Sequence, residues 1–473
     1  MSAPAPIIPS TSSIQGKTHC PGRSPSGWAG RWAEKMLDDA NMPVNSDRPR
    51  LIAVVNSSIA VGFLQGQLQY LQDRGFDVTV ISPGGNGLDQ MARIEGVRTI
   101  EVPMARQISP LRDLVSLWRL WRIMRDLRPT VTNVGTPKAG LLGGLAAWLN
   151  RVPCRFYTLR GLRFETTNGL KRRLLIYAER LACRFAHRVI CVSKSVREMA
   201  MASGLTSWEK TVVFGCGGSN GVDASRFAPT SERITRATEL RRELGIPPSA
   251  PVMGFVGRLT RDKGVPELVE AFIRLRDQFP DLRLLLLGRF ECEDPLPVEI
   301  RRRLETHPQV VLMGHQQGNG KPPLAGQPRG DWPVEDAAPY YSLMDVFVLP
   351  SHREGLPKVI LEAQAACKPV AAARATGIVD AVAHEDTGLL FPVGDREALT
   401  GAVARLLSDK ALATKLACAG HERVKREFRQ EQVWEALYQE YQGYMQIRDI
   451  PLPAMSSLET SSRSQGSVTA GCR

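Results

Sequence analysis

The sequence predicts an α/β protein with two doubly wound parallel sheets, and three observations lead to this prediction. Short apolar runs alternate with amphipathic segments along the chain, which is the rhythm of β-α-β units. The runs are almost wholly apolar, so each strand is expected to be buried on both faces. The rhythm stops at the turn-rich segment "NGVDASRFAPTSE" and then restarts, which indicates two sheets rather than one.

The elements follow in order along each half. In the first half the rhythm runs through "RLIAVVNS", "FLQGQLQYLQDRG" and "FDVTVIS", and later through "RVICVS" and "KSVREMAMASG". After residue 226 it restarts with "VMGFVGRL", "VPELVEAFIRLRDQF", "LRLLLLG", "VVLMG", "YYSLMDVFVLPS", "LPKVILEAQAA", "PVAAA" and "TGLLF". Sheets of this kind bind ligands at the carboxyl ends of their strands, so the residues just after each run are the ones to search.

The composition and the two ends limit the classes of protein. Residues 1–49 and 450–473 are rich in Ser, Pro and Gly without hydrophobic periodicity, so both are expected to be disordered tails. No apolar window of membrane-spanning length and no signal peptide are seen, which makes the cytoplasm the default location. The nine cysteines lack a C-x-x-C pair, which argues against a disulfide framework and a zinc site.

Positive charge is concentrated in the first half. Residues 51–225 carry 23 Lys and Arg against 12 Asp and Glu. Two stretches explain the excess: "SPLRDLVSLWRLWRIMRDLRP", with an apolar stripe predicted through Leu114, Leu117, Trp118, Trp121 and Met124, and "NGLKRRLLIYAERLACRFAHR". Both favour an acidic membrane surface as partner, with ordinary packing helices as the alternative. Nucleic acid is disfavoured because no recognition motif accompanies the charge.

Two cations stand in a predicted strand-to-helix loop of the second half. In "GFVGRLTRDKGVPELVEAF" the strand breaks at Gly257, and the helix restarts near Pro266, so Arg258 and Lys263 lie between them. Free N–H groups and the dipole at a helix start add to these side-chain charges. The loop is therefore a candidate site for a diphosphate.

Two glutamates eight residues apart, Glu354 and Glu362, stand in "SHREGLPKVILEAQA". If this segment is mostly helical, the carboxylates are separated by roughly 12 Å, comparable to the distance between the two sugars of a nucleotide sugar. A carboxylate accepts two hydroxyl hydrogen bonds, so one glutamate can hold the transferred sugar and the other the ribose. Gly355 would let the backbone approach the phosphates.

The chain resembles glycosyltransferase family 4 enzymes of the GT-B fold. The stretches "GRLTRDKG", "MDVFVLPSHREGLPKVILEAQA" and "ATGIVDAVAHEDTGLLFPVGD" stand in that family's order and spacing, and the resemblance covers about residues 51–447. Further stretches, among them "TPKAGLLGGLAA" and "YTLRGLRFETTNGLKRRLL", are similar to the subgroup that builds bacterial capsule, exopolysaccharide or lipid-linked oligosaccharide.

The resemblance implies a domain plan. It gives an acceptor-binding domain in 51–225, a nucleotide-sugar-binding domain in 226–430, and a helix in 431–447 that crosses back to the first domain.

The resemblance also implies roles for individual residues. Arg258 and Lys263 would contact the donor diphosphate, Glu354 the donor sugar and Glu362 the ribose, and we assign Gly257 and Leu356 to the same donor site. Family members are retaining and need no metal, so no cofactor is expected.

The sequence departs from the family at three places. Relatives commonly place a His-Gly pair where this chain has Arg160-Gly161, and an arginine cannot act as a base. The first Gly-rich loop offers only Gly62 and Gly66. Arg160 and Gly62 are kept as candidates for a contact with acceptor or sugar. Residues 315–336 form a longer Gly- and Pro-rich loop, for which an inert insertion is favoured over a lid.

The expected function is retaining transfer of a hexosyl or N-acetylhexosaminyl group. The donor would be a nucleotide diphosphate sugar, UDP-linked by preference, and the acceptor a polyprenyl-diphosphate-linked glycan in exopolysaccharide, capsule or O-antigen synthesis. The enzyme would act as a peripheral protein at the inner face of the cytoplasmic membrane. Two alternatives stay open: a GDP-mannose-dependent mannosyltransferase, and a catalytically inactive basic scaffold that binds nucleotide.

Overall fold

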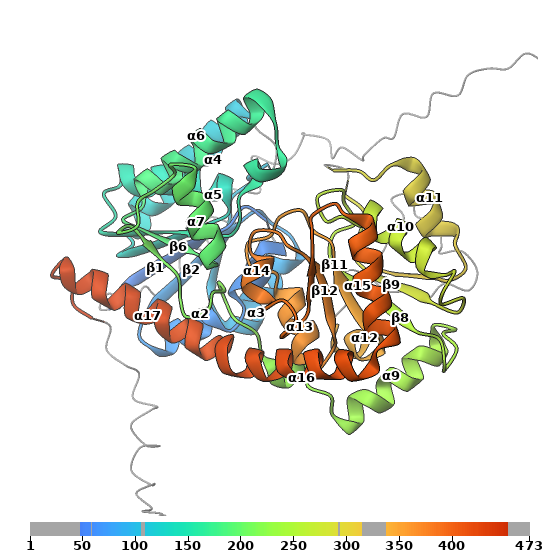
Figure 1. Cartoon of the computed structure of the whole chain (residues 1–473). Helices are drawn as coiled ribbons and strands as arrows, with labels where there is room; N and C mark the ends of the chain where they lie inside the picture. Colours follow the sequence, from blue (N-terminus) through green and yellow to red (C-terminus); the bar gives the residue numbers. More distant parts are fainter. Residues whose placement is uncertain (1–47, 58, 106–108, 292–293, 315–336, 453–473) are drawn as a thin grey trace, which may run out of the picture. The chain divides into compact units, whose positions relative to one another are not determined.

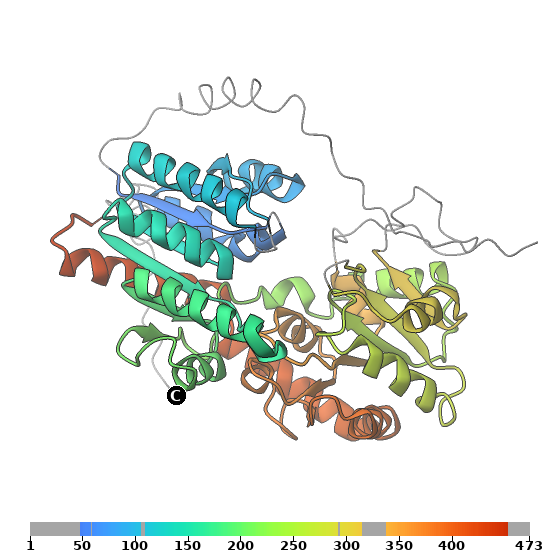
Figure 2. The same ribbon diagram turned by 90° about the horizontal axis from the view of Figure 1, so that it is seen from above.

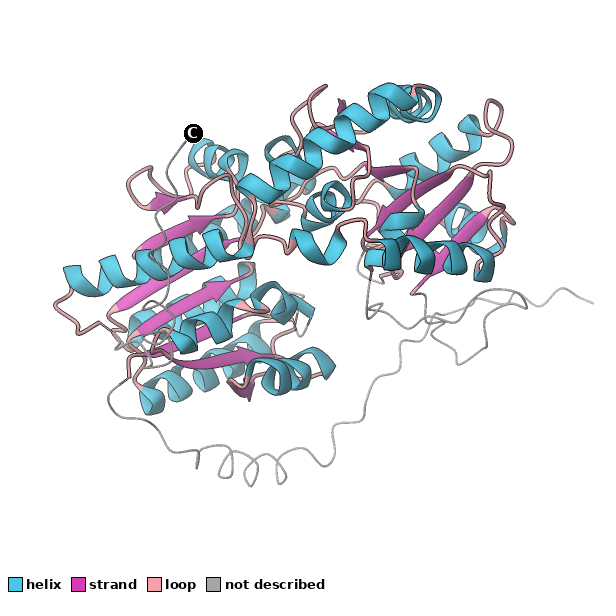
Figure 3. Cartoon of the chain, turned by 90° about the horizontal axis from the view of Figure 1, so that it is seen from below, coloured by secondary structure: helices cyan, strands magenta, loops and turns pink. Residues whose placement is uncertain are grey.

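A computed structural model describes residues 48–57, 59–105, 109–291, 294–314 and 337–452. Within these ranges the chain forms two parallel sheets, both covered by helices (Figures 1 and 3). The predictions for the tail in 1–47, the loop 315–336 and the tail in 453–473 fall outside the described residues. The predicted doubly wound α/β class is confirmed.

The first sheet has seven parallel strands in the order β3-β2-β1-β4-β5-β6-β7. Its strands are β1 (Arg50–Val54), β2 (Asp77–Ser82), β3 (Arg98–Glu101), β4 (Val131–Gly135), β5 (Cys154–Leu159), β6 (Arg188–Cys191) and β7 (Thr211–Val212). The strand order reverses direction between β1 and β4. In such a sheet the crevice for a ligand lies outside the carboxyl ends of the strands at this reversal.

The helical segments of the first half connect these strands. They are η1 (Ile59–Leu64), α2 (Gln67–Asp73), α3 (Asn86–Glu95), α4 (Pro110–Leu127), α5 (Pro137–Leu149), η2 (Arg163–Thr166), α6 (Gly169–Phe185) and α7 (Lys194–Ala202). α5 packs against both α4 and α6, and Figure 2 shows the three helices side by side. α4 and α5 each begin with a proline in the first turn, where the missing N–H removes no hydrogen bond.

The second sheet has six parallel strands in the order β10-β9-β8-β11-β12-β13. Its strands are β8 (Val252–Val256), β9 (Arg283–Leu287), β10 (Val310–Met313), β11 (Val346–Leu349), β12 (Val370–Ala373) and β13 (Leu389–Phe391). The helices of this half are α8 (Ala224–Phe227), α9 (Ser231–Glu243), α10 (Val265–Leu275), α11 (Val298–Thr306), α12 (Ala338–Leu343), α13 (Lys358–Ala365), α14 (Ile378–Ala381), α15 (Arg396–Ser408) and α16 (Lys410–Glu427). Here the order reverses between β8 and β11.

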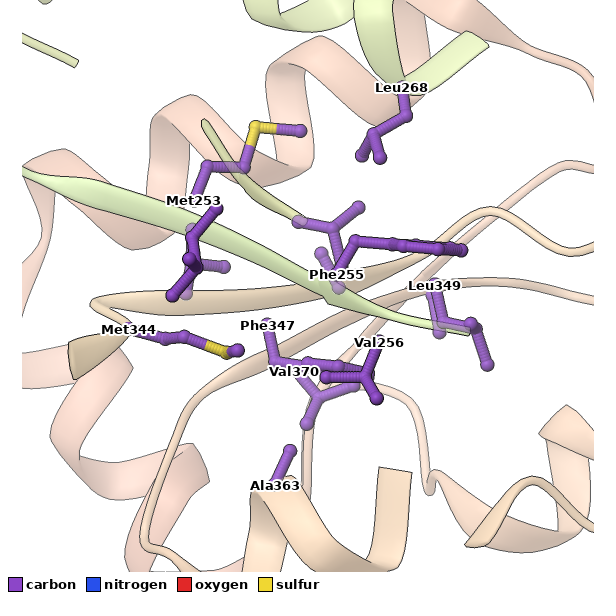
Figure 4. Packing of buried hydrophobic residues seen from close by; sticks show 14 of the residues in the cluster. Met253, Phe255, Val256, Leu268, Met344, Phe347, Leu349, Ala363 and Val370 are labelled. Atoms are coloured by element: carbon purple, nitrogen blue, oxygen red, sulfur yellow. The ribbon is translucent and has the colours of Figure 1, made fainter. Parts of the chain in front are cut away.

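The strands of the second sheet are buried on both faces, as their apolar runs predicted. Phe255, Phe347 and Leu349 are fully buried and pack with Met344 and Leu268 in one cluster (Figure 4). Burial of each such side chain contributes about 1.5–3 kcal/mol. The core therefore holds the carboxyl ends of β8 and β11 rigidly next to each other.

The last helix, α17 (Gln430–Ile447), packs against elements of the first half rather than the second. Tyr441 and Tyr438 of α17 share a buried cluster with Phe76 and Phe156. The Tyr441 hydroxyl also accepts a hydrogen bond of 2.6 Å from Asn133 Nδ2. Helix α17 thus completes the core beside β1 and β5.

Candidate functional site

The candidate site lies where β8 and β11 end. The loop after β8 and the loop after β11 touch, because the His352 backbone N–H donates to the Asp262 carbonyl at 2.9 Å. Gly264, at φ 70°, lies so close to the Pro350 carbonyl that a Cβ there would overlap it. Only glycine combines this left-handed backbone with this close approach. The two loops are therefore tightly joined at the reversal of the second sheet.

Helix α10 begins inside this site. It starts at Val265 with Pro266 in its first turn, which confirms the predicted start. Its N-cap residue, Gly264, has no side chain to bond the first N–H groups, and Glu267 is the one acidic residue of its first turn. Lys263 lies two residues before the helix, and Arg258 belongs to the same loop between β8 and α10. This arrangement favours an anion.

Each of the two cations has carboxylate partners in the structure. Lys263 Nζ forms an ion pair with Glu354 Oε1. Arg258 pairs with Asp262 at 3.3 Å and with Glu291 at 3.2 Å. Burial disfavours the charge of Arg258, yet Asp262 and Glu291 hold its pKa above the ordinary value. The predicted diphosphate cations and the predicted sugar carboxylate are thus brought together.

Glu354 does not lie in a helix, which corrects one expectation. α13 begins at Lys358, four residues later, with Pro357 at its N-cap position. Proline disfavours helical backbone in the residue before it, so the helix cannot extend back toward Glu354. The Glu354 backbone N–H donates instead to the Thr376 carbonyl at 3.0 Å. The 12 Å separation derived from a continuous helix therefore has no basis in the structure.

Glu362 lies within α13 and is held by a residue that the sequence did not single out. Its Oε2 accepts a hydrogen bond of 2.8 Å from the Tyr341 hydroxyl, and Lys358 Nζ is 4.0 Å from its Oε1. Tyr341 is fully buried, and burial together with the Glu362 charge raises the pKa of its hydroxyl. Glu362 is thereby oriented by the core of the second half.

The glycines and the leucine assigned to the donor site occupy close-packed positions. A Cβ at Gly355 would overlap the carbonyl oxygen of Arg160, so Gly355 permits the contact between these two loops. Leu356 is half-buried. Gly257 follows β8 directly, and its carbonyl fills the space beside Gly288.

Arg160 follows β5 at the carboxyl edge of the first sheet. Its Nη1 donates to Ser219 Oγ, its guanidinium lies 5.3 Å from the centre of the Phe63 ring, and its buried Nε has no hydrogen-bond partner. Burial lowers the pKa of Arg160 to about 10, and no carboxylate of the described residues offsets that effect. Gly62, in η1, has open space where a Cβ would stand.

Two acidic residues of the site were missed: Asp262 and Glu291. Asp262 also accepts from Arg353 at 3.0 Å, so it links two basic side chains. Burial opposes ionisation of Asp262, but Arg258 and a hydrogen bond from Thr260 bring its pKa below the ordinary value. A third acidic residue, Asp380, lies within α14 and accepts a hydrogen bond of 3.2 Å from the Ser195 backbone N–H.

Comparison with known proteins identifies the family. The family model described as "Glycosyl transferase 4-like domain" matches residues 63–217, and the one described as "Glycosyl transferases group 1" matches residues 250–409. The capsular polysaccharide biosynthesis glycosyltransferase CapM of Staphylococcus aureus is 31% identical over 396 residues, which are 84% of this chain and 97% of that protein. The chain belongs to glycosyltransferase family 4.

Further relatives of this glycosyltransferase differ in their donors. The UDP-Gal:alpha-D-GlcNAc-diphosphoundecaprenol alpha-1,3-galactosyltransferase of Escherichia coli is 27% identical over 73% of this chain and 84% of that protein. A GDP-mannose-dependent alpha-mannosyltransferase of Mycobacterium tuberculosis is 29% identical over 79% of this chain and 89% of that protein. The family assignment is thus firm while the donor differs among relatives.

The fold of the glycosyltransferase is similar to that of a GT-B protein of known structure. HepE of Anabaena, solved in complex with UDP and glucose, superposes with a TM-score of 0.66 at 19% identity and covers 84% of this chain and 100% of that one. The predicted GT-B fold is confirmed.

Across the part of the chain that the structure describes, no helix has the length and apolar character needed to span a membrane. Within those same residues, no group of three or more His, Cys, Asp and Glu side chains is arranged to hold a metal ion.

Proposed function

We propose that this glycosyltransferase is a retaining enzyme that transfers a hexosyl or N-acetylhexosaminyl group from a UDP-sugar to a polyprenyl-diphosphate-linked glycan. It would work at the inner face of the cytoplasmic membrane, in capsule, exopolysaccharide or O-antigen synthesis. The similarity to CapM over 84% of the chain supports a role in polysaccharide assembly. The E. coli relative supports a UDP-sugar donor and a lipid-linked acceptor.

The observation that carries the proposal is the Lys263–Glu354 ion pair just before the start of α10. A donor diphosphate placed here would meet Lys263 and Arg258 together with the positive end of the helix dipole. Glu354, already in contact with Lys263, then lies next to the sugar that the diphosphate carries. This ion pair would therefore help to orient both the diphosphate and the sugar of the donor during transfer.

Glu362 would bind the ribose of the donor. The Tyr341 hydroxyl occupies one lone-pair position of Oε2 and so fixes the rotamer of Glu362. A carboxylate retains further acceptor positions for the two ribose hydroxyls. Gly257, Gly355 and Leu356 would line the same donor site.

The chemical step would consist of positioning and charge stabilisation. Attack by the acceptor hydroxyl on the face from which the diphosphate leaves would retain the anomeric configuration. The departing phosphate oxygen would accept the hydroxyl proton, so no side-chain nucleophile is needed. Arg258, Lys263 and the start of α10 would stabilise the charge that develops on the diphosphate. This account requires no cofactor.

Arg160 and Gly62 are proposed contacts for the acceptor or the sugar. Both belong to segments at the carboxyl edge of the first sheet, on either side of the reversal between β1 and β4. Arg160 is half-buried, and a guanidinium is suited to binding an oxyanion, so its accessible N–H groups could contact the donor or the acceptor. An arginine here would orient a substrate and would not act as a base.

A thermal-shift panel tests the donor. Purified full-length protein is heated with UDP-, GDP-, ADP- and dTDP-sugars, and a UDP-sugar is expected to raise Tm. A ligand at 100 times its Kd adds about 2.7 kcal/mol to stability. The Arg258→Ala/Lys263→Ala variant should lose the shift. Arg301→Ala/Lys425→Ala, which removes two exposed cations elsewhere in the second half, should keep it.

The other outcomes of the panel are informative. A shift with GDP-mannose alone would replace the UDP-sugar by a mannosyl donor within the same reaction class. No shift with any donor, in a protein shown to be folded by circular dichroism, would contradict the enzyme and favour an inactive scaffold. A shift that the Arg258→Ala/Lys263→Ala variant retains would contradict the diphosphate site.

A further inference from the structure

The outer surface of α4, α5 and α6 exposes large apolar side chains. These three helices lie side by side, with α5 in the middle (Figure 2). We call their exposed surface the outer helix face. Its exposed apolar residues are Leu111, Leu114, Val115 and Trp118 of α4, Trp148 and Leu149 of α5, and Leu170, Leu174 and Tyr177 of α6.

α4 has two apolar stripes rather than one. Leu120, Ile123 and Met124 are buried, and Leu117 and Trp121 pack against the same core. Leu111, Leu114, Val115 and Trp118 form a second stripe with the spacing i, i+3, i+4, i+7, which is exposed: Leu111 is 83% and Trp118 is 53% accessible. The single predicted stripe is therefore wrong, because Leu114 and Trp118 point away from the core. A second stripe at helical spacing indicates a partner.

α6 repeats the pattern. Leu170, Leu174 and Tyr177 have the spacing i, i+4, i+7, and Leu170 is 81% accessible. The opposite side of this helix buries Glu179, Ala182 and Cys183 against the first sheet. Both outer helices of the layer thus present an apolar stripe outward.

The charge on the outer helix face is almost wholly positive. Its exposed cations are Arg112, Arg122, Arg125, Lys171, Arg172, Arg173, Arg180 and Arg184. The acids of α4 and α6 leave little negative charge there. Asp113 is paired with Lys138 at 2.8 Å, Glu179 is buried, and Asp126 lies 3.8 Å from Arg122. Apolar stripes flanked by Lys and Arg have the composition of an interfacial membrane helix.

We infer that the outer helix face docks on an anionic lipid bilayer. The apolar stripes would enter the boundary between headgroups and acyl chains, and the cations would contact phosphate headgroups. A second copy of the chain fits poorly, because the two faces would bring like charges together. An acidic protein partner would match the cations, but two apolar stripes on the two outer helices of one layer match a flat surface better.

The position of the stripes indicates which edge of the first sheet would face the membrane. This step rests on the proposed function. The exposed stripe of α4 and that of α6 both belong to the N-terminal part of their helix. α6 follows β5 and Arg160, so its first turns lie at the carboxyl edge of the first sheet. Docking through these turns would hold that edge at the membrane surface, where the sugar of a lipid-linked acceptor is presented.

Co-sedimentation with vesicles tests the docking without requiring donor or activity. Full-length protein is mixed with vesicles of phosphatidylglycerol and phosphatidylcholine, and with vesicles of phosphatidylcholine alone. We expect binding to the anionic vesicles that falls steeply with salt, and about tenfold or greater loss in Lys171→Gln/Arg172→Gln/Arg173→Gln. Leu114→Gln/Trp118→Gln should bind weakly at every salt concentration.

A matched control removes the same residue types elsewhere. Ile234→Gln/Arg242→Gln on α9 deletes one exposed apolar residue and one exposed cation and should bind like the unchanged protein. Equal binding by all variants, or equal binding to neutral vesicles, would overturn the inference. So would a dimer in size-exclusion chromatography without lipid that the α4 variant abolishes. Because no nucleotide sugar is present, a failed donor assay and a failed docking assay are distinguishable.

Discussion

Arg155 lies in β5 and Arg160 directly follows it, and the two arginines differ in their hydrogen-bond partners. Arg155 donates from Nε to the Phe185 carbonyl and from Nη1 to the Val152 carbonyl, both at 2.8 Å. Arg160 has a buried Nε without a partner, and no carboxylate offsets its charge. Arg160 is half-buried, and partial burial of a cation without an anion costs free energy, so we expect Arg160 to contribute little to stability in the absence of an anionic ligand.

We therefore expect Arg160→Met to separate stability from activity. Methionine has similar length and no charge, so Tm should stay equal or rise, while donor turnover should fall at least about tenfold. The measurements are Tm by circular dichroism and release of nucleotide from the donor that the thermal-shift panel identifies.

Arg155→Met is the control for this substitution. It breaks two hydrogen bonds to backbone carbonyls and should lower stability by about 1–3 kcal/mol without affecting turnover of the folded protein. Unchanged turnover in Arg160→Met would assign Arg160 a structural role only.

At the scale of elements, α6 is fixed to β5 by a buried hydrogen-bonded pair, Tyr157 and Glu179. The Tyr157 hydroxyl donates to Glu179 Oε2 at 2.6 Å, and both residues are buried. Burial raises the pKa of Glu179 to about 7, although the hydrogen bond from Tyr157 acts to lower it. Between the ordinary pKa of 4.5 and about 7, the folded state binds more protons than the unfolded state. Stability from this site is therefore greatest at low pH and is lost as pH rises through that interval.

Glu179→Gln should remove this dependence on pH. Glutamine keeps an acceptor for Tyr157 and carries no charge, so its advantage over glutamate should be small near pH 5 and grow to at most roughly 3 kcal/mol at pH 8. Urea unfolding at the two pH values measures it. Glu198→Gln, an exposed carboxylate on α7, controls for net charge. An advantage that is equal at both pH values would show that Glu179 is not the titrating group.

At the scale of the whole molecule, helix α17 near the C-terminus stabilises the first sheet. α17 carries Tyr441 into the cluster that also contains Phe156 of β5, with ring centres 4.7 Å apart. Ile447 of the same helix is 73% exposed. Substitutions of Tyr441 and Ile447 therefore compare a buried position with an exposed position of the same helix.

Tyr441→Ala is expected to destabilise the protein by about 3–5 kcal/mol, since it leaves a cavity and removes the partner of Asn133. Ile447→Ala should change stability by no more than about 0.5 kcal/mol. Hydrogen exchange should report the loss in β1 and β5. Similar effects of the two substitutions would mean that α17 contributes through its length rather than through this core contact.

The sequence by itself determined the α/β class, the existence of two sheets and the position of the two loops that follow β8 and β11. A short and almost wholly apolar run such as "LRLLLLG" predicts a buried strand. Pro266 marks the start of α10 because its ring suits a first turn. The sequence also placed Arg258, Lys263 and Glu354 in loops that follow strands and Glu362 in a helix, and their roles in binding a donor stay a prediction.

Only the tertiary structure decided which residues meet. The partners Lys263 and Glu354 are 91 positions apart, and Tyr341 with Glu362 are 21 apart, so no local pattern connects them. Pro357 ended the helix that was expected to include Glu354. In α4 the sequence contains two apolar stripes of the same period. Periodicity shows that such faces exist, but the packing of α4 against α5 and the sheet determines which one is buried and which one remains available to a partner.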